Sequence, residues 1–338
     1  MNSNETFKSK FNPCNIELLS DLTKDSFGSI VYDNTFIIYK SIDDILYLIY
    51  SSQNNSTIFF NLLNQQKICE IKNKNYSTSS YRAYLDKRNK RDLLIMISRD
   101  NNNIIIYNLK DMHIILHLKD IYEEGEMYSS CFLNINNNIY IATSNCNFEG
   151  VSKLIYVFDL KGNKIKEITE SNNNIYYIDF YYDKKQSKNY IISSHYKYIR
   201  SYDYDNNKLY YTYSDGDIGH FKFIINSFDE ENIKIIESSW NGKIRIWNFH
   251  SGELLKKMEL KYAQIREICL WDENYLFLGC DDNKIKLLNL NEQKEIKSFN
   301  GHKDWILSIK KVLHPKYGEC LISQGYEKDQ IKMWIIKN

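Results

Sequence analysis

The sequence predicts an all-β fold built from seven copies of one four-stranded unit. A large apolar residue, followed in six of the seven copies by Asn or Asp, recurs at spacings of 41 to 51 residues. Short apolar runs of β type flank every copy, and sustained helical periodicity is missing. Four short strands in about 45 residues are typical of one blade of a β-propeller, so we expect seven blades of four antiparallel strands. The recurring residues are Phe60, Tyr107, Phe158, Tyr202, Trp247, Leu288 and Trp334.

Each copy has the order first, second, third and outer strand. The recurring residue ends the third strand, and a short polar turn leads from it to the outer strand. First strands follow an apolar-x-x-apolar-x-apolar pattern, clearest from Ile175 to Phe180 and from Ile265 to Leu270, and vaguer in the first two copies. The expected second strands are residues 45–50, 93–97, 139–142, 190–192, 233–236, 275–278 and 320–322. The expected outer strands are residues 66–71, 112–118, 164–168, 208–213, 253–258 and 295–299.

The two ends of the sequence complement each other. The last copy stops after its third strand, residues 331–336, whereas residues 15–22 look like an outer strand with no blade before them. Unpaired sheet edges are a liability, so we expect the N-terminal strand to join the last blade and close the ring. The predicted organisation is a polar tail, residues 1–13, followed by a single propeller domain, residues 14–338.

Composition excludes several classes of protein. Lys and Arg number 44 against 43 Asp and Glu, so the chain lacks the basic footprint of a nucleic-acid binder. No apolar stretch approaches the ~20 residues of a membrane helix, and the polar N-terminus does not resemble a signal peptide. The seven cysteines include no CxxC pair. We expect a monomeric cytoplasmic protein, neither secreted nor transmembrane, with the nucleus left open as an alternative.

The last copy carries the clearest family features. Gly301 and His302 open it, and Ser323 and Trp334 follow. These residues resemble the WD40-repeat family over residues 14–338. The resemblance implies a buried hydrogen-bonded network of His302, Ser323 and Trp334, with Glu327 or Asp329 as its acid. In the fifth copy it implies structural roles for Trp247 and for His220, because Gly219-His220 and Trp247-Asn248 match the family pattern.

Catalytic signatures are missing from the sequence. It has no GxSxG, HExxH, P-loop or GxGxxG segment, and we predict no cofactor and no metal site. His113 and His117 are four residues apart, but we interpret them as edge-strand histidines because no further ligand stands at a recognisable spacing. An enzyme with its site over the central channel remains a minor alternative.

Two sets of residues are candidate binding sites. The resemblance implies peptide docking around one mouth of the channel, with Trp240 and Trp305 as anchors. The other residues expected on that rim are Gln264, Asp281, His195, Tyr326 and Asp100. On the opposite rim, loops between first and second strands carry a possible patch for an acidic partner: Lys87, Arg88, Lys90, Arg91, Lys184, Lys185 and Lys188. We place Lys310 and Lys311 in or near the corresponding loop of the last blade.

These expectations favour a non-catalytic scaffold or adaptor that binds a protein or peptide partner, as part of a multiprotein complex. Membrane binding through anionic headgroups is the alternative, although the Phe-Arg-Arg-Gly motif of phosphoinositide-binding propellers is missing. A substrate-receptor role in a ubiquitin ligase also stays open. Residues 158–161 (Phe-Asp-Leu-Lys) only distantly approximate the Trp-Asp-x-Arg signature of such receptors.

Overall fold

The computed structural model describes residues 13–23, 35–52, 54–72, 80–98, 102–122, 125–146, 153–170, 174–260, 264–326 and 330–336. These residues form seven four-stranded antiparallel sheets and one short 3-10 helix, Pro13–Asn15. Within those ranges, no helix has the length and apolar character needed to span a bilayer. The chain divides into two compact units: unit 1 combines Met1–Ile30 with Gly219–Asn338, and unit 2 is Val31–Ile218.

Unit 2 holds four consecutive sheets, each an up-and-down run of neighbouring strands. The first two are β2 (Phe36–Lys40), β3 (Leu46–Ser51), β4 (Ser56–Asn61), β5 (Gln66–Lys72), and β6 (Ser80–Asp86), β7 (Arg91–Ser98), β8 (Asn103–Asn108), β9 (His113–Leu118). The next two are β10 (Glu126–Ile135), β11 (Asn138–Cys146), β12 (Lys153–Asp159), β13 (Lys164–Glu170), and β14 (Ile175–Asp183), β15 (Lys188–His195), β16 (Ile199–Asp203), β17 (Lys208–Tyr213).

Unit 1 holds the remaining three sheets. Two are β18 (His220–Asn226), β19 (Lys234–Ser239), β20 (Lys243–Asn248), β21 (Leu254–Glu259), and β22 (Ile265–Leu270), β23 (Tyr275–Cys280), β24 (Ile285–Asn289), β25 (Lys294–Phe299). The third is β26 (Ile306–His314), β27 (Gly318–Gly325), β28 (Ile331–Ile336) and the N-terminal β1 (Ile16–Asp21). β1 pairs antiparallel with β28, from Ile16 opposite Ile336 to Asp21 opposite Lys332.

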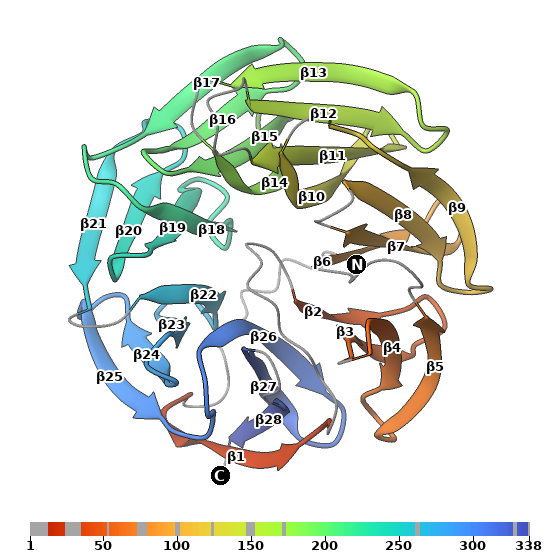
Figure 1. The fold of residues 1–338 in the computed structure, drawn as a ribbon. Helices are drawn as coiled ribbons and strands as arrows, with labels where there is room; N and C mark the ends of the chain where they lie inside the picture. Colours follow the sequence, from red (N-terminus) through yellow and green to blue (C-terminus); the bar gives the residue numbers. More distant parts are fainter. Residues whose placement is uncertain are drawn as a thin grey trace. The chain divides into compact units, whose positions relative to one another are not determined.

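The fold class predicted from the sequence is confirmed. The seven sheets are the four-stranded blades of a seven-bladed β-propeller, and the last blade takes its outer strand from the N-terminus. Within each unit, the first strands of successive blades lie side by side, and the fourth strand forms the far edge of each blade (Figure 1).

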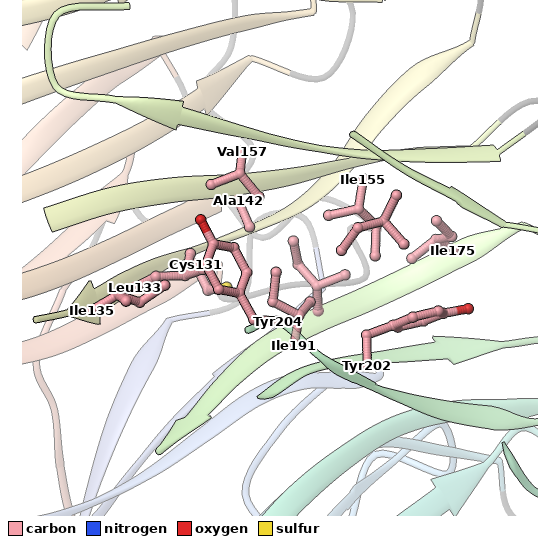
Figure 2. Close-up of a cluster of buried hydrophobic side chains, with 12 residues drawn as sticks. Cys131, Leu133, Ile135, Ala142, Ile155, Val157, Ile175, Ile191, Tyr202 and Tyr204 are labelled. Carbon is pink, nitrogen blue, oxygen red and sulfur yellow. The ribbon is translucent and has the colours of Figure 1, made fainter. Parts of the chain in front are cut away.

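Neighbouring blades are held together by apolar side chains between their faces. Figure 2 shows such a core between the sheets β10–β13 and β14–β17, where Leu133, Ile155 and Val157 of one blade meet Ile175 and Ile191 of the next. Burying an aliphatic side chain of this size contributes about 1.5–3 kcal/mol. Equivalent cores join the blades of unit 1, with Ile265 and Leu276 in one and Ile306 and Leu321 in another.

The Asn or Asp that ends the third strand in the first six blades has a local structural role. Its side-chain oxygen accepts a hydrogen bond from the backbone N–H two or three residues later and so begins the turn to the fourth strand. Donor–acceptor distances are 2.9 Å from Leu63 to Asn61, from Lys161 to Asp159, from His250 to Asn248 and from Asn291 to Asn289. Asn108 and Asp203 accept the same kind of bond from Lys110 and Asn206.

Every fourth strand carries a bulge opposite the recurring apolar residue. Trp247 pairs with Leu254 and Ile246 with Lys256, so Leu255 is the extra residue in β21. Ile68, Ile165 and Ile296 are the corresponding residues in β5, β13 and β25, and all three are exposed. A bulge twists an edge strand and hinders pairing with another chain.

Candidate functional site

A second kind of bulge positions the candidate binding residues. In five blades the first strand contains one extra residue immediately after its start. In the sixth blade Ile265 pairs with Cys280 and Glu267 with Gly279, which leaves Arg266 as the extra residue. A bulge changes the direction of the side chain at that position, so this residue does not follow the regular alternation of side chains between the two faces of the sheet. The equivalents of Arg266 are Tyr128, Tyr176, Phe221 and Leu307.

Arg266 is the centre of an aromatic and polar cluster between the last two blades. Its guanidinium lies over the ring of Trp305, 4.6 Å from the ring centroid, and Nη2 donates to Gln264 Oε1 at 3.1 Å. The Trp305 ring stacks on Tyr326, with 5.4 Å between centroids and 23° between planes. Arg266, Trp305 and Tyr326 are all partly exposed, and Gln264 is exposed.

Backbone hydrogen bonds hold the same segments together. Gln264 N donates to Asp281 Oδ1 at 2.9 Å, and Asp281 N donates to the Gln264 carbonyl at 3.1 Å. Tyr326 N donates to the Trp305 carbonyl at 2.8 Å. Gln264, Arg266, Asp281, Trp305 and Tyr326, here named the Arg266 cluster, are therefore ordered without a partner, which lowers the entropic cost of binding one.

The structure brings together four of the seven residues expected on the channel-mouth rim: Gln264, Asp281, Trp305 and Tyr326. Trp240 lies in the preceding blade, partly buried, with its ring 5.4 Å from that of Phe221. Asp100 lies outside the described residues.

The prediction that His195 contacts a partner is wrong. This side chain is fully buried, and its Nε2 makes a 2.9 Å hydrogen bond with Ser193 Oγ in the same strand. Its ring also lies 4.8 Å from that of Tyr198 in the turn that follows, a contact that the position at the strand end did not indicate.

Sequence reasoning missed Arg266, although a signal for it was present. The apolar spacing Ile265, Ile268, Leu270 differs from the i, i+2, i+4 alternation of a regular strand by one residue. The bulge at Arg266 is that residue. The same spacing at Ile175, Ile178 and Phe180 marks the bulge at Tyr176. The paired registers of β2 with β3 and of β6 with β7 run without a shift, which explains the vaguer pattern in the first two blades.

The loops of the expected basic patch lie between first and second strands, as predicted, but some of their charges are already paired. Arg91 Nε donates to Asp86 Oδ2 at 2.7 Å, and Lys188 Nζ lies 3.6 Å from Asp203 Oδ2. Lys87, Arg88, Lys90, Lys184 and Lys185 are exposed in these turns.

Two further lysines do not lie in a loop. Lys310 and Lys311 belong to β26, where Lys311 pairs with Glu319 at 2.6 Å and Lys310 approaches Glu267 at 3.5 Å. The expectation that they lie in or near a loop of the last blade is therefore wrong: Lys310 contacts the neighbouring blade, and Lys311 binds both Glu319 of its own sheet and the Trp271 carbonyl of the neighbouring blade.

Ionisable groups do converge on the first strands of unit 1. The buried Glu267 carboxylate accepts a 2.7 Å hydrogen bond from the buried Lys222 of β18, in addition to the contact with Lys310. Burial raises the pKa of Glu267, but the charges of Lys222 and Lys310 outweigh it and the net shift is downward. A carboxylate held ionised by two ammonium groups is a poor proton acceptor, so this geometry favours a structural ion network that joins three blades.

The last blade contains the network of His, Ser and Trp. His302 Nε2 lies 2.6 Å from Ser323 Oγ, and Trp334 Nε1 donates to the same oxygen at 2.7 Å. All three residues are buried. Glu327 and Asp329, the candidate acids, lie outside the described residues.

The fifth blade is built differently. His220 is the first residue of β18 and contacts the buried Glu237 carboxylate at 2.8 Å, and Arg245 binds the same carboxylate at 2.7 Å. His220 therefore contacts a buried carboxylate of the adjacent strand β19, which Arg245 also binds. Trp247 lies in β20, the third strand of this blade, and its side chain is buried, with 2% of its surface exposed.

His113 and His117 lie on the exposed edge strand β9, as the sequence indicated, and His113 Nδ1 contacts Asp111 at 2.6 Å. The described part of the chain contains no group of three or more His, Cys, Asp or Glu side chains placed to hold a metal ion.

The fold and this geometry define the chain as a seven-bladed β-propeller protein. No family model matches the sequence, and no curated protein matches it either.

Proposed function

We propose that this propeller is a non-catalytic interaction scaffold of the WD40 type, which binds a protein or peptide partner at the Arg266 cluster. The observation that carries the proposal is the partly exposed stack of Arg266, Trp305 and Tyr326. Trp, Tyr and Arg are the residues most enriched at the energetic centres of protein interfaces. The buried contacts of His302, Ser323 and Trp334 support the WD40 assignment, since the family combines these residue types in one blade.

The alternatives receive less support. A membrane-binding role would draw on the exposed cations of the two basic loops, but two members of the expected patch, Arg91 and Lys188, are already engaged by Asp86 and Asp203. An enzymatic role needs a reactive group, and Glu267, the best candidate, is neutralised by lysines. We propose the cytoplasm as the compartment and a multiprotein complex as the setting.

The test is affinity purification with the wild-type chain and the double variant Arg266→Ala/Trp305→Ala. Partners identified with the wild type are then purified and their dissociation constants measured for both chains. We expect the double variant to bind at least about tenfold more weakly, which corresponds to ~1.4 kcal/mol.

The matched control is Leu255→Ala/Ile296→Ala, which alters two exposed residues on the far edges of blades in the same unit. This variant is expected to bind like the wild type. Unchanged affinity in the Arg266→Ala/Trp305→Ala chain, with an unchanged thermal unfolding midpoint, overturns the proposal.

A further inference from the structure

A pocket of about 530 Å³ lies between the second and third blades, within unit 2. Three hairpins line it: the β6–β7 turn, the β10–β11 turn and the β12–β13 turn. Its volume falls in the range of ordinary ligand sites, about 300–1,000 Å³. The pocket belongs to a different unit from the Arg266 cluster.

Three cations line this pocket. Arg88 and Lys161 are exposed, and their charged ends have no ionic partner among the described residues. Arg91 is half-buried, and its Nε is bound to Asp86 at 2.7 Å. Because only Nε is engaged, Asp86 orients the guanidinium and leaves its two terminal nitrogens available for a ligand.

The acid at the pocket is already satisfied. Asp159 Oδ1 accepts the backbone N–H groups of Lys161 and Asn163, both at 2.9 Å, and Oδ2 accepts Asn163 Nδ2 at 2.9 Å. Burial opposes ionisation of Asp159, but these hydrogen bonds outweigh it and lower its pKa. Asp159 is therefore held in its ionised form, but the three cations outnumber this one lining carboxylate and the pocket surface is cationic on balance.

Apolar surface lies beside the cations. Ile165, the bulged residue of β13, also lines the pocket and is 48% exposed, and Tyr140 is partly exposed on β11. Cations beside one exposed aliphatic side chain fit a segment in which acidic residues flank an apolar one. Small inorganic anions would leave Ile165 uncovered.

We propose that this pocket is a second docking site, which binds an acidic segment of a partner protein. Arg88, Arg91 and Lys161 pair with its carboxylates, and Ile165 contacts its apolar side chain. This inference goes beyond the proposed function because it assigns a second binding site, which selects its ligand by charge. A scaffold that joins two proteins needs two such separate sites.

The test uses the full chain and a short fluorescein-labelled peptide in which glutamates flank one leucine. Fluorescence anisotropy measures its binding to the wild type, to Arg88→Glu/Lys161→Glu and to the control Lys184→Glu/Lys185→Glu. The control reverses two lysines that are equally exposed but lie outside the pocket. We expect the pocket variant to bind at least about tenfold more weakly, the control to stay within about threefold, and added salt to weaken wild-type binding.

Three outcomes overturn the proposal. If a peptide with glutamine in place of glutamate binds the wild type as tightly as the glutamate peptide does, the site is not selective for charge. If the pocket variant and the control lose the same affinity for the glutamate peptide, the effect comes from the overall charge of the protein and not from the pocket. Binding of a phosphoserine peptide or of phosphatidylserine vesicles, without binding of the glutamate peptide, assigns the pocket to a different anion source. Arg266→Ala/Trp305→Ala is expected to bind the peptide like the wild type, so the two proposed sites can fail independently.

Discussion

Several turns of this propeller place ordinary side chains where glycine is the residue with the least strain. The sequence contains only 12 Gly, and Gln65 and Gln293 adopt φ angles of 55° and 54° in turns between third and fourth strands. Gly252 occupies the same position in the fifth blade, with φ of 68°. A left-handed conformation costs a residue with a Cβ about 1–2 kcal/mol. The scarcity of glycine therefore reduces the stability of the fold without changing it.

Replacing these two residues by glycine is expected to stabilise the protein. Gln65→Gly and Gln293→Gly relieve the left-handed strain, and part of the gain is offset by the greater freedom of glycine in the unfolded chain. We expect about 0.5–1 kcal/mol for each, measured by urea unfolding. Lys110→Gly, in an equivalent turn but without a positive φ, is expected to destabilise the protein. Destabilisation by all three changes would contradict the strain argument.

Ser323 Oγ is the shared hydrogen-bond partner of two buried ring nitrogens in the last blade. Ser323→Ala removes the hydrogen bonds of His302 Nε2 and Trp334 Nε1 and leaves both groups buried. An unsatisfied buried polar group costs about 1–3 kcal/mol, so we expect a loss of at least that size in the free energy of unfolding. Ser251→Ala, at an exposed turn, is the control and is expected to change it by less than about 0.5 kcal/mol. If Ser323→Ala and Ser251→Ala lower the free energy of unfolding by similar amounts, the hydrogen bonds of Ser323 do not contribute to stability.

At the scale of the element, β1 decides whether the last blade has an open edge. Beyond the strand ladder, Leu22 N donates to the Ile331 carbonyl at 2.7 Å, and Lys332 Nζ donates to Asp21 Oδ1 at 2.6 Å. These contacts join residues more than 300 positions apart in the sequence. The N-terminal segment is therefore a structural part of the last blade.

Deletion of residues 1–22 is expected to expose the edge of β28 and to lower the thermal unfolding midpoint. Exposed edges pair with other chains, so light scattering should also show aggregation. Deletion of residues 1–12, which keeps β1, is the matched control and should leave both measurements unchanged. A synthetic peptide of residues 13–23 should restore the larger deletion by adding the missing strand. A monomeric deletion chain with a wild-type midpoint would show that β1 is dispensable.

At the scale of the whole molecule, buried carboxylates link stability to pH. Burial raises the pKa of Asp86 and of Asp203, but hydrogen bonds from Asn89 and Asn206 and the cations Arg91 and Lys188 outweigh it, and the net pKa of each is lowered. Glu267 follows the same balance, with lysines as its partners. A carboxylate whose pKa is lower in the folded state stabilises that state above the unfolded value, about 4, and this stability is lost as the pH falls through the folded value.

The free energy of unfolding is therefore expected to be level near neutral pH and to fall below about pH 4. The variant Asp203→Asn should lose stability at neutral pH and show a shallower acid slope, because it has no carboxylate to protonate there. Urea unfolding at a series of pH values measures both. Glu273→Gln serves as the control, since this carboxylate is exposed in a loop. An acid slope identical in wild type and Asp203→Asn would contradict the assignment.

The reactivity of the cysteines provides a second measurement of the stability of the whole fold. The six cysteine side chains that the structure describes are thiols, and burial raises the pKa of Cys269 to about 11 and those of Cys280 and Cys320 to about 12. Thiolates are the reactive form, so these three are expected to stay unmodified by a disulfide reagent at pH 8 until the protein unfolds. Cys14, which is partly exposed, should react before these three. Mass spectrometry of the labelled sites checks the order, and rapid native labelling of Cys280 would contradict the burial argument.

The strands and their order could be predicted from the sequence because they depend on local signals. The aromatic residue followed by Asn or Asp is a strand end and an Asx-type turn in one dipeptide, as Phe60-Asn61 and Trp247-Asn248 show. Four residues of the Arg266 cluster could also be identified, because the ends of second strands and the starts of first strands lie at fixed places in every blade. Burial could not be predicted in the same way: His195 occupies a strand end, where a partner contact was expected, yet its side chain is fully buried.

By itself, the sequence determined the number of blades, the order of the strands within each blade and the pairing of the N-terminal strand with the last blade. These properties follow from periodicity, and periodicity survives the replacement of Gly and Trp by other residues. Most second strands are longer than expected, as Lys188–His195 in place of residues 190–192 shows. Only the tertiary structure decided which charges are paired, that Arg266 joins Trp305, and that three hairpins of two blades line one pocket. The physical reason is that a bulge changes the direction of a side chain by one position, and that contacts between blades join residues from different repeats, about which the pattern within one repeat carries no information.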